Sequence, residues 1–136
     1  MENLEKEMES LYQNMDYFVR RDPPENLNFE ENYWDVAQDP DGRERYHLEE
    51  RDRGLENIHE ELSFINNLRP GVVLDIGCGI GTMLSGIDDK WEKHGFEVSQ
   101  FGADQAKQYG EIKVGVFNDK LYSQNQFDLV TMHHVI

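Results

Sequence analysis

The chain has 136 residues, the size of one domain, and 38% of them are hydrophobic while 30% are charged. Its formal net charge is −15 at pH 7, and so acidic a surface repels phosphates, which excludes a general nucleic-acid-binding role. No apolar run is long enough for a membrane span, and the first residues do not form a secretory leader. Cys78 is the only cysteine, so an internal disulfide is excluded and a cytoplasmic location is expected.

Residues 1–45 are predicted to form an N-terminal helix and an acidic connecting segment that act as a cap or lid. Apolar residues recur at helical spacing over about 2–20, and this helix either covers the core or lies over a cofactor. Asp22-Pro23-Pro24 ends the helix, because proline lacks an N–H donor and restricts the residue before it. Tyr33 and Trp34 stand in the polar segment, where they either pack on the core or close over a ligand. Packing is the favoured interpretation.

Residues 46–136 are predicted to form the main domain. The patterns indicate a helix over about 46–68, a strand from Val72 to Ile76, helices over 82–87 and 99–109, and strands over 95–98, 112–116 and 127–132. Ser99 is predicted to be the N-cap of the helix over 99–109. This alternation is typical of the α/β class. We therefore expect a Rossmann-like, mostly parallel sheet with helices on both faces, apparently truncated after the fourth strand.

A glycine-rich loop follows the first of these strands and indicates a ligand site. Gly77, Gly79 and Gly81 give the spacing G-x-G-x-G. The dinucleotide fingerprint needs a glycine where Thr82 stands, and a P-loop needs a lysine that this loop lacks. Asp75 directly before the loop would repel a pyrophosphate but suits a ligand with positive charge. The sequence therefore favours a nucleoside-like ligand without phosphates.

Two further features bear on that ligand. Glu97 ends the next predicted strand, where its carboxylate can accept hydrogen bonds from the two ribose hydroxyls, and Val98 beside it can lie against adenine. The alternative for Glu97 is an exposed acid at a strand end, and ribose binding is favoured. Arg43, Arg45, Arg51 and Arg53 stand before or early in the helix upstream. They either pair with neighbouring acids, which is favoured, or one of them meets a ligand carboxylate.

From about Tyr33 to Ile136 the chain resembles the class I S-adenosylmethionine-dependent methyltransferases. Residues 73–81 match the first motif of that family almost letter for letter, and residues 95–99 resemble the second motif with its ribose-binding acid. Residues 127–136 resemble the motif of the fourth strand. The pattern from Glu97 to Ala106 is similar to a bacterial subgroup that modifies small molecules or sugars.

The resemblance implies S-adenosylmethionine as the cofactor and S-adenosylhomocysteine as the product, with no metal. It implies that the cofactor is bound by Asp75, Gly77, Cys78, Gly79, Glu97, Val98, Phe117, Met132 and His133. Val116 departs from the pattern, since many relatives carry an acid there, so adenine recognition is expected to rest on Phe117. No catalytic residue is assigned. His133 or His134 is a candidate general base only if the acceptor is a hydroxyl or similar group.

The resemblance further implies transfer of a methyl group to a small-molecule or sugar acceptor. The alternative is a non-catalytic S-adenosylmethionine-binding or interaction module. The family's sheet usually has seven strands, whereas four are predicted here, so the chain is expected to be the N-terminal portion of a longer enzyme. The competing explanation for the exposed edge of the fourth strand is a homodimer that pairs two such edges.

Overall fold

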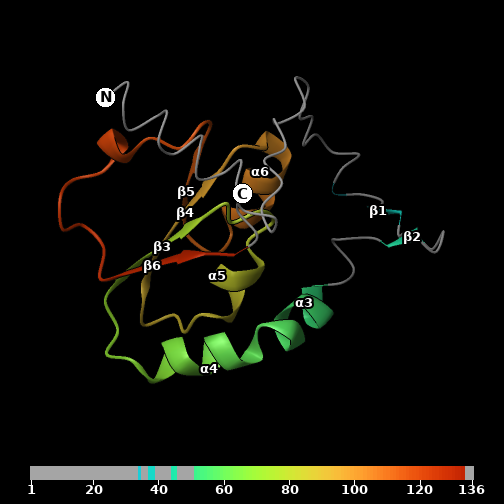
Figure 1. Ribbon diagram of the computed structural model, residues 1–136, viewed down its shortest axis with the longest axis horizontal. Helices are drawn as coiled ribbons and strands as arrows, with labels where there is room; N and C mark the ends of the chain where they lie inside the picture. Colours follow the sequence, from blue (N-terminus) through green and yellow to red (C-terminus); the bar gives the residue numbers. More distant parts are fainter. Residues whose placement is uncertain (1–33, 35–36, 39–43, 46–50, 134–136) are drawn as a thin grey trace, which may run out of the picture.

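The computed structural model describes residues 34, 37–38, 44–45 and 51–133 (Figure 1). The predicted helix over 2–20, Tyr33 and His134 lie outside the described residues. Strands β1 (Ala37–Gln38) and β2 (Glu44–Arg45) pair antiparallel, which the sequence patterns did not predict. None of the described helices is long and apolar enough to cross a membrane.

A four-stranded parallel sheet forms the centre of the domain. Its strands lie in the order β5-β4-β3-β6, as Figure 1 shows, and every neighbouring pair is parallel. The predicted Rossmann-like class is therefore confirmed. In chain order the strands are β3 (Val72–Ile76), β4 (Glu92–Glu97), β5 (Glu111–Val114) and β6 (Leu129–Met132).

The connections between strands place a reversal beside β3. The chain leaves β3 through α5 (Thr82–Gly86) to reach β4, and α6 (Gln100–Ala106) leads on to β5. It then returns through a crossover with the short 3-10 helix η1 (Asp119–Leu121) and adds β6 on the other side of β3. Open parallel sheets bind ligands at the carboxyl ends of the strands where the order reverses. The glycine-rich loop and His133 both follow strands at this point.

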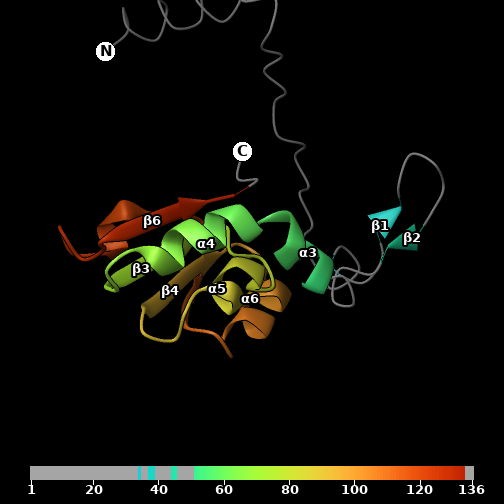
Figure 2. The same cartoon turned by 90° about the horizontal axis from the view of Figure 1, so that it is seen from below.

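The long helix predicted over 46–68 is divided into α3 (Arg51–Asn57) and α4 (His59–Asn67). Ile58 lies between them with φ −112° and ψ 19°, outside the helical range, and Figure 2 shows the change of direction at this point. Ile58 nevertheless belongs to the core, and α3 packs against α5. The apolar spacing continues through the break, which is why it predicted one helix.

The two faces of the sheet are covered differently. The residues of α4, α5 and α6 share one hydrophobic cluster with Val73 of β3, and Val73 and Leu84 are fully buried in it. On the other face an aromatic group joins His94 and Phe96 of β4 to the β5–β6 crossover through Phe117 and Phe127. Within the described ranges, the only helix on that second face is η1. Helices therefore lie on both faces as predicted, but the second face carries only this short 3-10 helix.

Three strand boundaries differ from the prediction by two residues or more, and a specific polar or glycine residue lies at each. β4 begins at Glu92 rather than at 95. The buried Lys93 is tolerated inside this strand because its ammonium forms an ion pair with Asp89 at 2.9 Å. β5 ends at Val114 rather than 116, because Gly115 takes a φ of +133°. β6 begins at Leu129, two residues after the predicted start of this strand. Just before it, the Asp128 carboxylate accepts a hydrogen bond from the backbone N–H of Val72 at 2.8 Å.

Candidate functional site

The glycine-rich loop, residues 77–81, is tied to the end of β4 by backbone hydrogen bonds. The N–H groups of Gly77 and Cys78 both donate to the carbonyl oxygen of Phe96, at 2.7 and 3.1 Å. Gly77, Gly79 and Gly81 adopt φ values of 72°, 54° and 84°, in the left-handed region that favours glycine. The loop therefore has a fixed shape that a side chain at these positions would strain.

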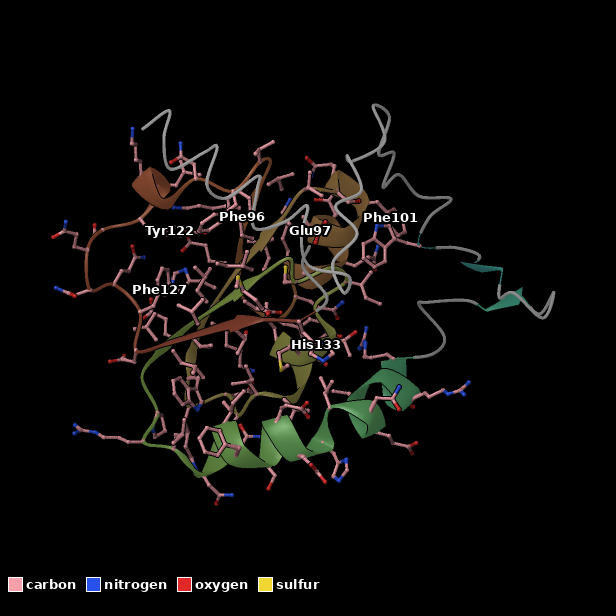
Figure 3. The ribbon with its side chains drawn as sticks, viewed as in Figure 1. Phe96, Glu97, Phe101, Tyr122, Phe127 and His133 are labelled. Carbon is pink, nitrogen blue, oxygen red and sulfur yellow. The ribbon has the colours of Figure 1, made fainter. Side chains whose placement is uncertain are left out.

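Glu97 reinforces this tie with its side chain (Figure 3). Oε2 accepts a hydrogen bond from the backbone N–H of Gly79 at 2.8 Å, and Oε1 accepts one from the N–H of Ser99 at 2.9 Å. The residue is 5% exposed. A carboxylate has about four acceptor sites, so the two backbone bonds leave acceptor capacity on both oxygens. Glu97 is thus a structural acceptor in the ligand-free chain as well as a candidate ribose ligand.

Trp34 packs directly on the loop. An added Cβ on Gly79 would lie 2.8 Å from the indole, and one on Gly102 at the start of α6 would lie 3.1 Å from it. The indole N–H donates to the Ser99 hydroxyl at 3.0 Å, and that hydroxyl also accepts from the N–H of Gly102 as the predicted N-cap of α6. Trp34 therefore packs as the favoured interpretation predicts, and two glycines make room for it. It also lines the cavity described below, so the alternative, closure over a ligand, stays open.

Asp75 lies under the loop as a buried acid. It is 3% exposed, and its Oδ1 accepts a hydrogen bond from the Thr131 hydroxyl of β6 at 2.7 Å. The pKa of this carboxyl is raised from 3.8 to about 6, chiefly by burial; the Thr131 hydrogen bond lowers the pKa and the nearby Glu97 charge raises it. Near neutral pH the site therefore holds an ionised carboxylate at a cost in stability.

A cavity of about 440 Å³ opens beside Asp75 and combines charges of both signs. Arg51 and Arg53 line it from α3. The Arg51 guanidinium lies 5.0 Å from the centre of the Tyr109 ring, and its buried Nε has no hydrogen-bond partner in the part of the chain that the structure describes. An acid and two arginines around one cavity suit a ligand that carries both an ammonium and a carboxylate.

The structure brings together five of the nine predicted site residues. Asp75, Gly77, Cys78, Gly79 and His133 all line this cavity. Glu97 adjoins it through its bond to Gly79. The other three lie outside the cavity lining at the carboxyl edge or crossover, with exposed fractions of 51% for Val98, 42% for Phe117 and 66% for Met132.

Cys78 is a buried part of the loop rather than a reactive thiol. It is 6% exposed, and burial together with the charges of Asp75 and Glu97 raises the pKa of its thiol. Its sulfur occupies space beside Gly95, where an added Cβ would approach it to 2.8 Å. Cys78 is therefore a small buried side chain that fills space within the loop.

Several lining residues were not assigned to the site from the sequence, and Arg51 was considered only as the less favoured partner of a ligand carboxylate. Arg51, Gly54 and Ile58 recur at intervals of three and four, which places them on one side of α3 and its end, facing the cavity. The sequence already showed this spacing, but the same spacing is expected for the core-facing side of any amphipathic helix, so it did not indicate a ligand site. Thr131 carried no comparable signal, because its contact depends on the pairing of β6 with β3.

The chain is thus a Rossmann-like domain with a cavity at the switch point of its sheet. A family model described as a methyltransferase domain matches residues 47–136. The chain belongs to this methyltransferase domain family. No curated protein matches the chain.

The chain is also similar to several solved structures at low sequence identity. The chain is 22% identical to the plantazolicin methyltransferase BamL, with a TM-score of 0.47 over 61% of this chain and 37% of that chain. It is 23% identical to the PH0226 protein from Pyrococcus horikoshii OT3, with a TM-score of 0.44 over 63% of this chain and 42% of that one. For magnesium protoporphyrin IX methyltransferase from Synechocystis PCC 6803 the identity is 19% and the TM-score 0.41, over 63% and 42%. The chain thus spans less than half the length of each.

Proposed function

We propose that this chain binds S-adenosylmethionine and is the cofactor-binding part of a methyltransferase. The observation that carries the proposal is the cavity at the switch point, which Asp75, Arg51 and Arg53 line together with the glycine-rich loop. Membership of the methyltransferase domain family supports the same reading. The cofactor offers an ammonium, a carboxylate and a ribose, and the site has a group suited to each.

The amino-acid end of the cofactor is assigned to the cavity. Asp75 accepts from the ammonium, directly or through water, and Arg51 or Arg53 pairs with the carboxylate. The unpartnered Nε of Arg51 among the described residues is a donor of the kind this requires. Gly77 and Gly79 allow the chain of the cofactor to lie against the backbone.

The nucleoside end is assigned to the ends of β4 and β5. Glu97 uses its remaining acceptor capacity for the ribose hydroxyls. Val98 and Phe117 are exposed apolar side chains that flank adenine from either side. Met132 offers its backbone carbonyl to the ammonium at the end of β6, and His133 lines the cavity next to it.

When bound, the cofactor supplies an activated methyl group on a sulfonium. The protein then has to hold donor and acceptor in line and to exclude water. Trp34 and Glu97 hold the glycine-rich loop in place, and the loop then provides a rigid binding surface for this alignment. His133 serves as a general base where the acceptor is a hydroxyl, because it is the imidazole at the edge of the cavity.

The wider assignments follow from the sequence patterns. The acceptor is a small molecule or a sugar, of the class modified by the bacterial subgroup that the chain resembles. Residues 1–45 form a cap and residues 46–136 the cofactor-binding domain. A cytoplasmic location agrees with the single buried cysteine. β6 is an outermost strand of the described sheet, and a second copy of the chain can pair with its outer edge.

Calorimetric titration with two ligands tests the proposal. S-Adenosylhomocysteine contains the amino-acid end, whereas 5′-methylthioadenosine keeps the nucleoside and lacks that end. Asp75→Asn and Arg51→Ala are expected to weaken S-adenosylhomocysteine binding about tenfold or more, and to leave 5′-methylthioadenosine binding within about twofold. The exposed Asp104→Asn is the matched control and changes neither. Failure of the wild type to bind S-adenosylhomocysteine, or equal losses for both ligands, contradicts the assignment.

A further inference from the structure

Thr131 is the residue of β6 that reaches across to the buried acid of β3. The two strands are parallel neighbours, and Thr131 and Asp75 occupy paired positions in their register. The Thr131 hydroxyl donates to Oδ1 of Asp75 at 2.7 Å, a short and charge-assisted hydrogen bond. This bond engages one oxygen of the carboxylate and leaves Oδ2 for another partner.

The surroundings make this contact more important than a surface hydrogen bond. Asp75 is 3% exposed, so water contributes little to stabilising its charge. The groups near it are Glu97 from β4, the Cys78 thiol of the loop, and the residues that share its cavity, namely Arg51 and Arg53 of α3 and His133 after β6. Glu97 opposes ionisation, whereas the Thr131 hydroxyl favours it.

We propose that Thr131 is a positioning residue for cofactor binding, whose hydroxyl keeps the Asp75 carboxylate ionised and oriented to receive the cofactor ammonium. The inference rests on the proposed function, since it assigns Thr131 a role in the same site. Thr131 itself makes no assigned contact with the cofactor and acts through Asp75.

The role has a consequence for pH dependence. Only the ionised carboxylate pairs with an ammonium, so cofactor affinity falls as the pH drops through the pKa of Asp75, which is about 6. Thr131→Val keeps the size and shape of the side chain but removes the donor. Loss of a hydrogen bond of about 1.4 kcal/mol raises the pKa of Asp75 by about one pH unit. Thr131→Ser keeps the donor and is expected to behave as the wild type.

Two measurements test the inference. The first follows the side-chain carboxyl signal of Asp75 by carbon NMR in the ligand-free protein from about pH 4 to pH 8, and the midpoint is expected to rise in Thr131→Val but not in Thr131→Ser. The second titrates S-adenosylhomocysteine across the same range. Wild type and Thr131→Val are expected to differ about fivefold near pH 6 and less than twofold near pH 8, where both carboxylates are ionised.

The outcomes separate the two proposals. An unchanged Asp75 midpoint in Thr131→Val, or an affinity ratio that stays constant with pH, overturns the role of Thr131, because a purely structural residue would weaken binding equally at every pH. A wild type that does not bind S-adenosylhomocysteine overturns the proposed function instead, while the ligand-free titration still tests the hydrogen bond. Thermal melting of both variants establishes that they are folded.

Discussion

Replacing Asp75 with asparagine is expected to make the folded chain more stable near neutral pH, although it removes a charge that the proposed cofactor needs. The carboxyl is buried, and its pKa rises from 3.8 to about 6. That difference corresponds to roughly 3 kcal/mol of penalty for the ionised form. Asparagine keeps an oxygen that can accept from the Thr131 hydroxyl, so the variant loses the charge and retains the hydrogen bond.

The pH dependence gives the sign of this effect. Because the folded pKa lies above the unfolded one, the folded state holds more protons between about pH 4 and pH 6. The stability of the wild type therefore falls as the pH rises through this window and stays lower above it. Asp75→Asn lacks that loss, so its advantage is absent near pH 4 and approaches about 3 kcal/mol above pH 6.

Urea unfolding of both proteins across about pH 4 to pH 8 measures this advantage. Asp104→Asn is the control, because that exposed carboxyl pairs with Lys107 and its pKa is lowered, so its replacement brings no stabilisation above pH 6. An Asp75→Asn protein that is less stable than the wild type near neutral pH would refute the reasoning. A difference that does not vary with pH would refute it as well.

Further predictions concern the groups that hold the loop. Glu97→Gln keeps one acceptor oxygen for two backbone N–H groups, so unfolding free energy is expected to fall by about 1–3 kcal/mol in denaturant titrations. Gly79→Ala places a Cβ 2.8 Å from the Trp34 indole at a φ of 54° and is expected to lower the melting temperature more than Gly54→Ala, which lies in α3 and whose Cβ meets only the Thr82 methyl group at 3.1 Å. Ser99→Ala removes the cap of α6 and the indole acceptor, with an expected cost of about 1–2 kcal/mol and a shift in tryptophan fluorescence.

The parts of the fold that the sequence predicted well depend on local patterns. The run from Val72 into the glycine-rich loop specified a buried parallel strand and a tight turn, and both are present. Ser99 was predicted as the cap of α6 from its residue type, and its hydroxyl has that role. Lys93 concealed the start of β4, because a buried lysine that reaches Asp89 looks like a loop residue in the sequence.

The parts that could not be predicted depend on contacts between distant segments. The bond from Trp34 to Ser99 spans 65 positions, and the bond from Thr131 to Asp75 spans 56. No periodicity encodes either pairing. The carboxylate of Glu97 could be placed at a strand end from the sequence, but its two backbone partners follow from the three-dimensional course of the loop. The sequence could thus place the candidate loop and strand ends, whereas the contacts that hold them together required the structure.

The central claim is that S-adenosylmethionine binds at the glycine-rich loop, and an amide NMR titration tests it most directly. Nitrogen-15-labelled chain is titrated with S-adenosylhomocysteine, and the shift of each backbone signal is followed. The account predicts saturable shifts that are largest at residues 77–81, at Ser99 beside Glu97 and at His133. The absence of shifts, or shifts centred on the η1 crossover instead of the loop, would contradict it.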